Sequence, residues 1–97
     1  MPYDLSVKAE EDLVRLYVDG VQRFGVETAE RYWIGLQRAF AFLTEHPGAA
    51  RERLEINPPV RIHPCGSHII VYIEKEEGEV LILRVRHGRE DWISDPL

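Results

Sequence analysis

The stretch Val80–Trp92, VLILRVRHGREDW, decides how the rest of the chain folds. Five of its first six residues are aliphatic, and such a run predicts a strand that is buried on both faces. Charged side chains then gather around Gly88, a residue that permits a sharp change of backbone direction. We expect the functional residues to lie at this charged exit from a buried strand.

The composition indicates a small globular protein without an internal disulfide. The chain has 97 residues, 44% of them hydrophobic, and a single cysteine, Cys65. We expect one domain over 1–97, since a chain of this length builds one modest core. No apolar run reaches the ~20 residues that cross a bilayer, and the first residues lack the pattern of a secretory signal. These features predict a cytoplasmic protein with no membrane partner.

The net charge argues against a dedicated nucleic-acid binder. Twelve Lys and Arg stand against seventeen Asp and Glu, which gives a formal charge of −5 at pH 7. Phosphate contacts supply most of the non-specific affinity for nucleic acid, so proteins of that class are usually basic. We therefore expect no direct binding to nucleic acid.

Hydrophobic periodicity predicts two helices ahead of three strands. Ser6 suits an N-cap, and apolar residues at helical spacing follow over about residues 7–24. A second, strongly amphipathic helix begins near Glu27–Thr28 and ends at His46-Pro47-Gly48. Because the connection at Gly25 is short, the two helices should form an antiparallel hairpin. Strands are expected at Val60–His63, His68–Lys75 and Val80–His87, after a short extended entry at Tyr3–Leu5.

The fold class that follows is α+β, in the order β-α-α-β-β-β, with the hairpin on one face of a mainly antiparallel sheet. Two-residue turns at Cys65-Gly66 and Glu77-Gly78 set a trial register. One face then carries Val60, Ile62, Ile69, Val71, Ile73, Ile82, Arg84 and Arg86, and the other carries Arg61, His63, His68, Ile70, Tyr72, Leu81, Leu83, Val85 and His87. Both faces are apolar in the middle, and one hairpin covers only one of them. The trial register thus predicts an uncovered apolar face, of roughly a few hundred Å², that binds a partner.

The order of elements and the residues around Gly88 resemble the RelE/ParE toxin superfamily of bacterial toxin–antitoxin modules. The resemblance covers nearly the whole chain and includes GSHIIVYIE at residues 66–74 and ILRVRHGREDW at residues 82–92. Within the superfamily, the pattern Arg84-Val85-x-His87-Gly88-Arg89-x-Asp91 is similar to the ParE branch. The resemblance implies a toxin that inhibits DNA gyrase and is held inactive by a cognate antitoxin. That antitoxin would be ParD-like, a ribbon-helix-helix protein with a disordered segment that folds on binding. No cofactor is expected.

RelE-type, ribosome-dependent mRNA endonucleases are the alternative within the superfamily. Cleavage of RNA through its 2′-hydroxyl needs a proton acceptor, a proton donor and a cation on the phosphate. Those enzymes place an arginine in the strand that corresponds to Ile69–Tyr72, and they commonly add a tyrosine near the C-terminus. This chain has neither, the region just before the three-stranded meander has no lysine, and only Arg89 has a counterpart. The departures favour a ParE-type protein that is not an enzyme. A module that binds its antitoxin but has lost toxicity is a third alternative.

The residues expected to contact a partner lie on the second face of the sheet and at the exit of its last strand: Arg61, Ile70, Tyr72, Arg84, Arg86, His87, Arg89, Asp91 and Trp92. The arginines among them would bind an acidic segment of the antitoxin. The alternative is that they form ion pairs with Glu90, Asp91 and acidic residues of the first helix. Trp92 is expected to be either a lid over the sheet or a contact residue.

Three histidines should gather near one end of the sheet. They are His63, His68 and His87, with Cys65 between the first two in sequence. Their spacing matches no zinc pattern, so no metal site is expected. An acid–base site formed with Arg61 is the other alternative to plain surface or hydrogen-bonded histidines.

Overall fold

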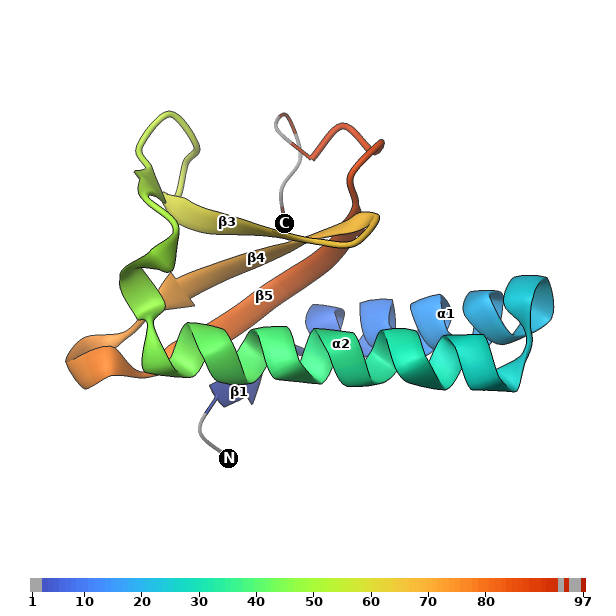
Figure 1. The fold of residues 1–97 in the computed structure, drawn as a ribbon. Helices are drawn as coiled ribbons and strands as arrows, with labels where there is room; N and C mark the ends of the chain where they lie inside the picture. The colour runs from blue at the N-terminus through green and yellow to red at the C-terminus, as the bar shows by residue number, and fades with distance from the viewer. Residues whose placement is uncertain (1–2, 93, 95–96) are drawn as a thin grey trace.

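The computed structural model describes residues 3–92, 94 and 97 and shows two helices on one side of a twisted sheet (Figure 1). Strand β1 (Tyr3–Leu5) leads into helices α1 (Val7–Phe24) and α2 (Val26–Glu45). The remaining strands are β2 (Glu52–Arg53), β3 (Val60–Cys65), β4 (His68–Glu74) and β5 (Val80–His87), and short 3-10 turns lie at Pro47–Ala49 and Glu76–Gly78. Within the described part of the chain, no helix is long and apolar enough to cross a membrane.

The sheet has five strands in the order β1-β5-β4-β3-β2. Strand β1 runs parallel to β5, and the other three pairs are antiparallel. The predicted α+β class, with a hairpin on one face of a mainly antiparallel sheet, is confirmed. Strand β2 was not predicted, because residues 47–59 carry no hydrophobic period. It is only two residues long and pairs with Val60 and Arg61.

The hairpin begins and turns where the sequence indicates. The Ser6 side chain accepts a hydrogen bond from the Ala9 N–H at 3.0 Å and so caps α1. Gly25 separates the helices with φ of 88°, a backbone conformation that glycine adopts without steric cost. The helices run antiparallel, and their tip at Gly25 projects beyond the end of the sheet (Figure 1).

The main core lies between the hairpin and the sheet. Its buried members are Ala9, Leu13, Leu36, Phe40, Leu43, Ile70, Tyr72, Val80, Ile82 and Val85. Ile70 and Tyr72 are 0% exposed there, so the expectation that they line an uncovered face is wrong for this chain alone. The Tyr72 hydroxyl is satisfied inside the core, because it donates to the Pro47 carbonyl at 2.9 Å.

The observed register corrects the trial register in two places. Cys65 pairs with His68, so the turn is Gly66-Ser67, and Gly66 has a positive φ of 60°. This two-residue shift leaves the faces of β3 unchanged, since side chains alternate with period two. A bulge at Val71/Tyr72 then pairs Tyr72 with Ile82. The bulge moves Ile82 to the helix side of the sheet, where it is fully buried.

The second face of the sheet is covered by the chain itself. Val60, Ile62, Ile69 and Val71 are each at most 7% exposed and form a second cluster with Ile56. Ile73, Leu83, Trp92 and Leu97 are partly buried against that cluster. The predicted uncovered face is therefore wrong. The loop after β2 and the segment after β5 lie on the side of the sheet opposite the helices (Figure 1), and periodicity within the strands does not encode them.

Candidate functional site

The exit of β5 is tied to α1 by one buried carboxylate. The Arg84 Nε and Nη2 donate to Asp12 Oδ2 and Oδ1 at 2.7 and 2.9 Å. The same Oδ2 accepts the backbone N–H of Val85 at 3.0 Å. Asp12 is 6% exposed, and the Arg84 Nη1 also donates to the Leu97 carbonyl oxygen at 2.9 Å. Asp12 therefore fixes both the side chain and the backbone of β5 where its charged part begins.

Ser6, just before α1, forms hydrogen bonds with β5 beyond the point where β1 ends. Pairing with β1 ends at Ile82, opposite Leu5. Just beyond it, the Ser6 hydroxyl donates to the Leu83 carbonyl at 2.7 Å, and the Ser6 N–H donates to the Ile82 carbonyl at 2.9 Å. Ser6 and Asp12 thus take over the hydrogen bonding of the β5 edge where β1 stops.

The turn after β5 is closed by Glu90. The Arg86 Nε donates to Glu90 Oε2 at 2.8 Å, and the Arg86 Nη2 lies 2.7 Å from the same oxygen. The backbone N–H of His87 donates to the same carboxylate at 3.2 Å. Burial alone would raise the pKa of Glu90, but the bonds from Arg86 and from the His87 N–H outweigh it and lower the pKa. Gly88 joins the turn to the β3–β4 connection, since its N–H donates to the Ser67 carbonyl at 2.9 Å.

Arg61 does not belong to this group, contrary to expectation. It lies opposite Tyr72, which pairs in turn with Ile82, so Arg61 is several residues away from the strand exit. Its guanidinium donates to the Ala50 carbonyl and lies 3.9 Å from Glu74. The trial register placed it near the other arginines because that register was shifted by two residues.

The remaining predicted contact residues differ in how accessible they are. Arg89 and Asp91 are exposed on the turn after β5. Trp92 is partly buried over the second sheet face, with the Arg53 guanidinium 5.8 Å from its ring centroid, so it serves as a lid. Ion pairing of Arg84 and Arg86 within the chain, the alternative stated above, is what the structure contains. Contact of these residues with a partner stays a prediction.

The histidines divide into two groups. His68 and His87 are paired across β4 and β5, with ring centroids 5.2 Å apart. His63 instead lies 5.7 Å from the ring of Phe42 on α2. Among the described residues, no three His, Cys, Asp or Glu side chains are grouped so that they could hold a metal ion.

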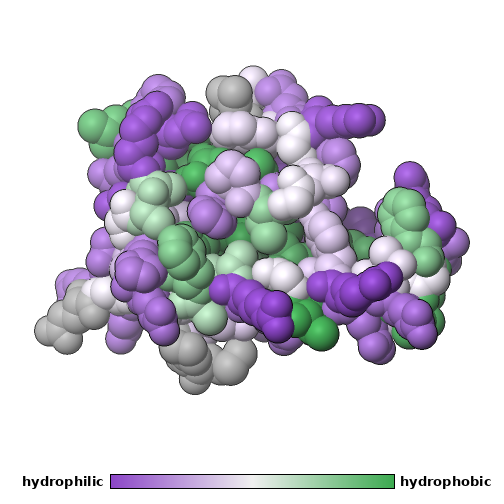
Figure 2. All heavy atoms as spheres, viewed as in Figure 1, coloured by the Kyte–Doolittle hydropathy of each residue, from purple (hydrophilic) through white to green (hydrophobic). Residues whose placement is uncertain are grey.

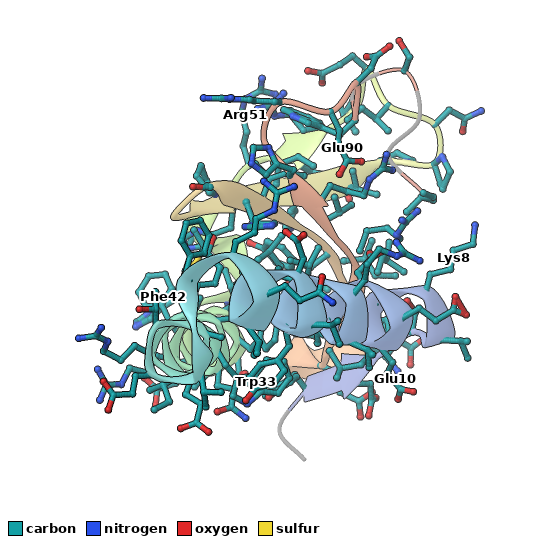
Figure 3. All side chains as sticks on the ribbon, turned by 90° about the vertical axis from the view of Figure 1, so that its right-hand side faces the viewer. Lys8, Glu10, Trp33, Phe42, Arg51 and Glu90 are labelled. Atoms are coloured by element: carbon teal, nitrogen blue, oxygen red, sulfur yellow. The ribbon has the colours of Figure 1, made fainter. Side chains whose placement is uncertain are left out.

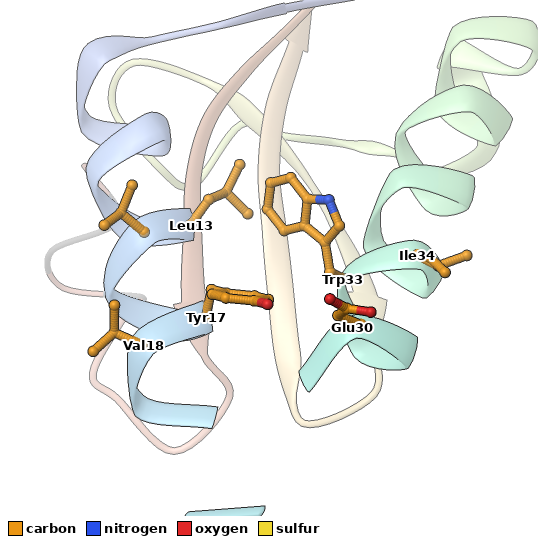
Figure 4. Close-up of a pocket in the computed structure, with 7 residues that line it drawn as sticks. Leu13, Tyr17, Val18, Glu30, Trp33 and Ile34 are labelled. Atoms are coloured by element: carbon orange, nitrogen blue, oxygen red, sulfur yellow. The ribbon is translucent and has the colours of Figure 1, made fainter. Parts of the chain in front are cut away.

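An apolar groove runs between the two helices on the side away from the sheet. Tyr17 and Trp33 face one another across it, with ring centroids 6.5 Å apart in an edge-on arrangement (Figure 4). Val14, Val18 and Ile34 on its rims are 65%, 49% and 45% exposed. The groove encloses about 520 Å³. Figure 3 shows Trp33 and Glu90 on opposite sides of the helices, so the groove and the β5 exit are separate surfaces.

Sequence reasoning allowed for ion pairs with acidic residues of the first helix but did not single out Asp12, and it missed this groove. The available signal for Asp12 was its position on the apolar face of α1, next to Ala9 and Leu13, where an unpaired carboxylate would be costly. The signal for the groove was the set of valines on the opposite side of the same helix. Trp33 is only partly buried: it packs against the core and also lines the groove.

The described residues bring together internally paired charges and exposed apolar side chains. The strand that would carry a nuclease arginine, β4, has Ile69–Tyr72 buried. The fold and its surfaces therefore define a small α+β protein whose accessible features are of the kind that contact other proteins.

The comparisons with known proteins identify the family. The model of the ParE toxin of type II toxin–antitoxin systems, parDE, matches residues 3–92. The Toxin ParE1 of Caulobacter vibrioides is 35% identical over 86 residues, which are 89% of this chain and 88% of that protein. The Toxin ParE1 of Mycobacterium tuberculosis is 35% identical over 89 residues, 92% of this chain and 91% of the relative. The chain belongs to the ParE toxin family of type II toxin–antitoxin systems.

The fold has a counterpart among solved structures. A chain described as "Chromosomal ParDE TA system from P. aeruginosa" superposes with a TM-score of 0.70. The match covers 88% of this chain and 95% of that chain, at 24% sequence identity. At this identity the likeness concerns the fold, and it agrees with the α+β architecture described above.

Proposed function

We propose that this ParE-family protein inhibits DNA gyrase by binding it, performs no chemistry of its own and is neutralised by a ParD-like antitoxin. Membership of the ParE family carries the proposal. An antitoxin partner is supported further by the structural neighbour, which was solved as part of a ParDE system. A cytoplasmic site of action follows from the proposed target, since gyrase acts on chromosomal DNA.

The arrangement of side chains supports binding over RNA cleavage. General acid–base catalysis on a 2′-hydroxyl needs titratable groups within hydrogen-bond reach of the substrate. In this chain the arginines at the β5 exit are held by Asp12 and Glu90, and the middle of β4 is packed inside the two cores. An inhibitor that acts by binding needs none of those catalytic groups, and the apolar groove and the exposed turn at Arg89 offer contact surface.

Induced expression in a bacterial host tests the proposal directly. Loss of gyrase function should block DNA replication and induce the DNA-damage response while translation continues. Purified protein should inhibit gyrase supercoiling of relaxed plasmid, and adding the product of a neighbouring ribbon-helix-helix gene should restore supercoiling. The matched control is the same toxin purified as a complex with that antitoxin.

The rival outcome is equally specific. Rapid cleavage of mRNA at ribosomes, detected by primer extension while DNA synthesis continues, would replace the gyrase proposal with RelE-type nuclease activity. Binding to the antitoxin with neither effect would identify a module that has lost toxicity.

A further inference from the structure

Exposed apolar side chains are concentrated on the helical hairpin. Val7, Val14 and Val18 are 71%, 65% and 49% exposed, and their spacing places them along one side of α1. The apolar surface continues to the hairpin tip, where Phe24 is 68% exposed and where Figure 2 shows hydrophobic side chains on the projecting end. From Val7 to Phe24 this strip is about 25 Å long, the length of a helix of roughly seventeen residues.

The strip forms one wall of the apolar groove between the two helices, which we call the helix groove. It is lined by Val14, Tyr17 and Val18 of α1 and by Glu30, Trp33 and Ile34 of α2, among others. Two antiparallel helices that lie side by side leave a concave line into which the side chains of a third helix can pack. The shape of the groove therefore suits a helical segment with one apolar face.

Acidic side chains lie toward the two ends of the helix groove. Glu30 lines it from α2. Glu10 lies one helical turn before Val14 on α1, and Figure 3 shows Glu10 on the same side of the helices as Trp33. Because Tyr17 faces Trp33, Glu10 lies about 10 Å from that point toward the start of α1, and Glu30 lies about 5 Å from it toward the tip. The two carboxylates are thus about 15 Å apart along the groove.

Both carboxylates are accessible to a partner. Glu10 and Glu30 are exposed, and neither forms an ion pair with another described residue. The exposed arginines of α2, Arg31 and Arg38, lie beyond Ile34 on the side turned away from α1, at a rotation of about 100° per residue. A helix that fills the groove therefore meets negative charge toward both of its ends.

These charges distinguish between possible occupants. If two copies of this chain paired through their grooves, the glutamates of one copy would meet those of the other, and like charges across an interface are unfavourable. An antitoxin segment with the acidic character expected above would also meet like charges here. A helix that carries Lys or Arg at both ends of its apolar face is complementary to the groove in shape and in charge.

We infer that the helix groove docks a helix of the toxin's target, and that this helix carries a Lys or Arg at each end of its apolar face, about ten residues apart. The spacing follows from about 15 Å at a rise of about 1.5 Å per residue. The inference rests on the proposed function, which makes gyrase the target. The apolar contacts supply affinity, and the charges set the orientation of the docked helix.

Binding to purified gyrase holoenzyme, measured by surface plasmon resonance, tests the apolar part of the inference. Ile34→Ser should raise Kd about tenfold or more, because it removes an apolar side chain from the docking surface. Phe42→Ser is the matched control, since Phe42 is on the same helix outside the groove and is 44% exposed, against 45% for Ile34. Circular dichroism checks that both variants are folded. Equal affinity of the two variants for gyrase would overturn the inference.

Charge reversal tests the acidic ends of the groove. Glu10→Lys combined with Glu30→Lys should raise Kd for gyrase about tenfold or more at low salt, and the difference should shrink as salt is added. Glu52→Lys combined with Glu76→Lys makes the same change in net charge at exposed sites outside the groove and should bind more tightly than the groove variant. Equal affinity of the two double variants would overturn the assignment of Glu10 and Glu30.

Two synthetic helical peptides test the groove without gyrase and so separate this inference from the proposed function. Both have one leucine face, with either lysine or glutamate at its two ends, about ten residues apart. The lysine peptide should shift the Trp33 indole signal in NMR and bind about tenfold more tightly at low salt than the glutamate peptide. Equal binding of the two peptides, or no shift at Trp33, would overturn the inferred chemistry of the groove.

The remaining outcomes are distinct. If the lysine peptide binds but the unmodified chain does not bind gyrase, the proposed function is refuted and the assignment of the groove to that target falls with it. If Ile34→Ser weakens binding to the antitoxin and leaves binding to gyrase unchanged, the groove belongs to the antitoxin and the inference is overturned.

Discussion

Removing the Asp12 carboxylate should destabilise the chain more than any other change of a single charged residue described above. Asp12→Ala leaves the Arg84 guanidinium without its bidentate partner and the Val85 N–H without an acceptor. Breaking a buried ion pair from one side costs roughly 3–5 kcal/mol. A buried unsatisfied N–H costs roughly 1–3 kcal/mol. The two costs overlap, because both arise from the loss of one carboxylate.

The environment of Arg84 reduces the expected loss. Its side chain is 15% exposed and keeps its bond to the Leu97 carbonyl oxygen, so solvent and that oxygen recover part of the energy. We expect Asp12→Ala to lower the free energy of unfolding by about 3–4 kcal/mol, a large share of the ~5–15 kcal/mol typical of small domains. With a urea m-value of about 1–3 kcal/mol/M, the unfolding midpoint should fall by roughly 2 M.

Urea unfolding followed by circular dichroism measures this loss, with four variants as comparison. Asp12→Asn keeps an oxygen for the Val85 N–H and removes only the charge, so it should lose about half as much. Glu11→Ala changes an exposed neighbour and should stay within about 0.5 kcal/mol of the unmodified chain. Asp12→Leu combined with Arg84→Met should be more stable than Asp12→Leu alone, since replacing both partners of a buried pair is often tolerated. A loss below about 1 kcal/mol for Asp12→Ala would refute the reasoning.

Three further predictions concern stability. Phe40→Ala should lower the free energy of unfolding by about 3–5 kcal/mol, because the ring is 1% exposed in the main core, and a change below about 1 kcal/mol in urea unfolding would contradict that. Gly66→Ala should lose roughly 1–3 kcal/mol, since φ is +60° and the new Cβ would lie 2.8 Å from the Tyr32 hydroxyl; an unchanged thermal midpoint would show that the turn relaxes freely. Burial, with His87 second, lowers the pKa of His68, so the unfolded chain binds more protons at mildly acidic pH. The contribution of neutral His68 to the free energy of unfolding should be fully present above about pH 7 and decline as the pH falls through about 6.5. His68→Gln should lessen that decline in a pH series of melting curves.

The elements of this fold could be predicted from local patterns, and their faces only in part. Alternation with period two assigned β3 correctly even with the wrong turn, because a shift of two residues preserves the faces. Alternation failed for the first part of β5, because the bulge at Val71/Tyr72 reverses which of its residues face the helices. Whether Ile82 faces the helices therefore depends on how β5 pairs with β4. The residues next to Ile82 in sequence do not determine it.

The charged residues were harder to assign than the apolar ones. A cluster such as Arg84 and Arg86 looks the same in sequence whether it contacts a partner or the chain itself. The choice depends on Asp12, 72 residues away from Arg84 in the chain, and on the turn that brings Glu90 back to Arg86. The packing of Ile56 and Trp92 on the second face could not be predicted either, because it depends on the positions of two irregular segments.

The way α1 closes the edge of β5 has a consequence for association between chains. Exposed strand edges are the sites where sheets of different molecules join and aggregate. Here the Leu83 carbonyl and the Val85 N–H are already occupied by Ser6 and Asp12. Intermolecular pairing along this edge therefore requires α1 to detach first. Intermolecular pairing along β5 should accordingly follow the local opening of one helix rather than complete unfolding, and a variant that loosens α1 should form intermolecular sheet under conditions where the unmodified chain stays dispersed.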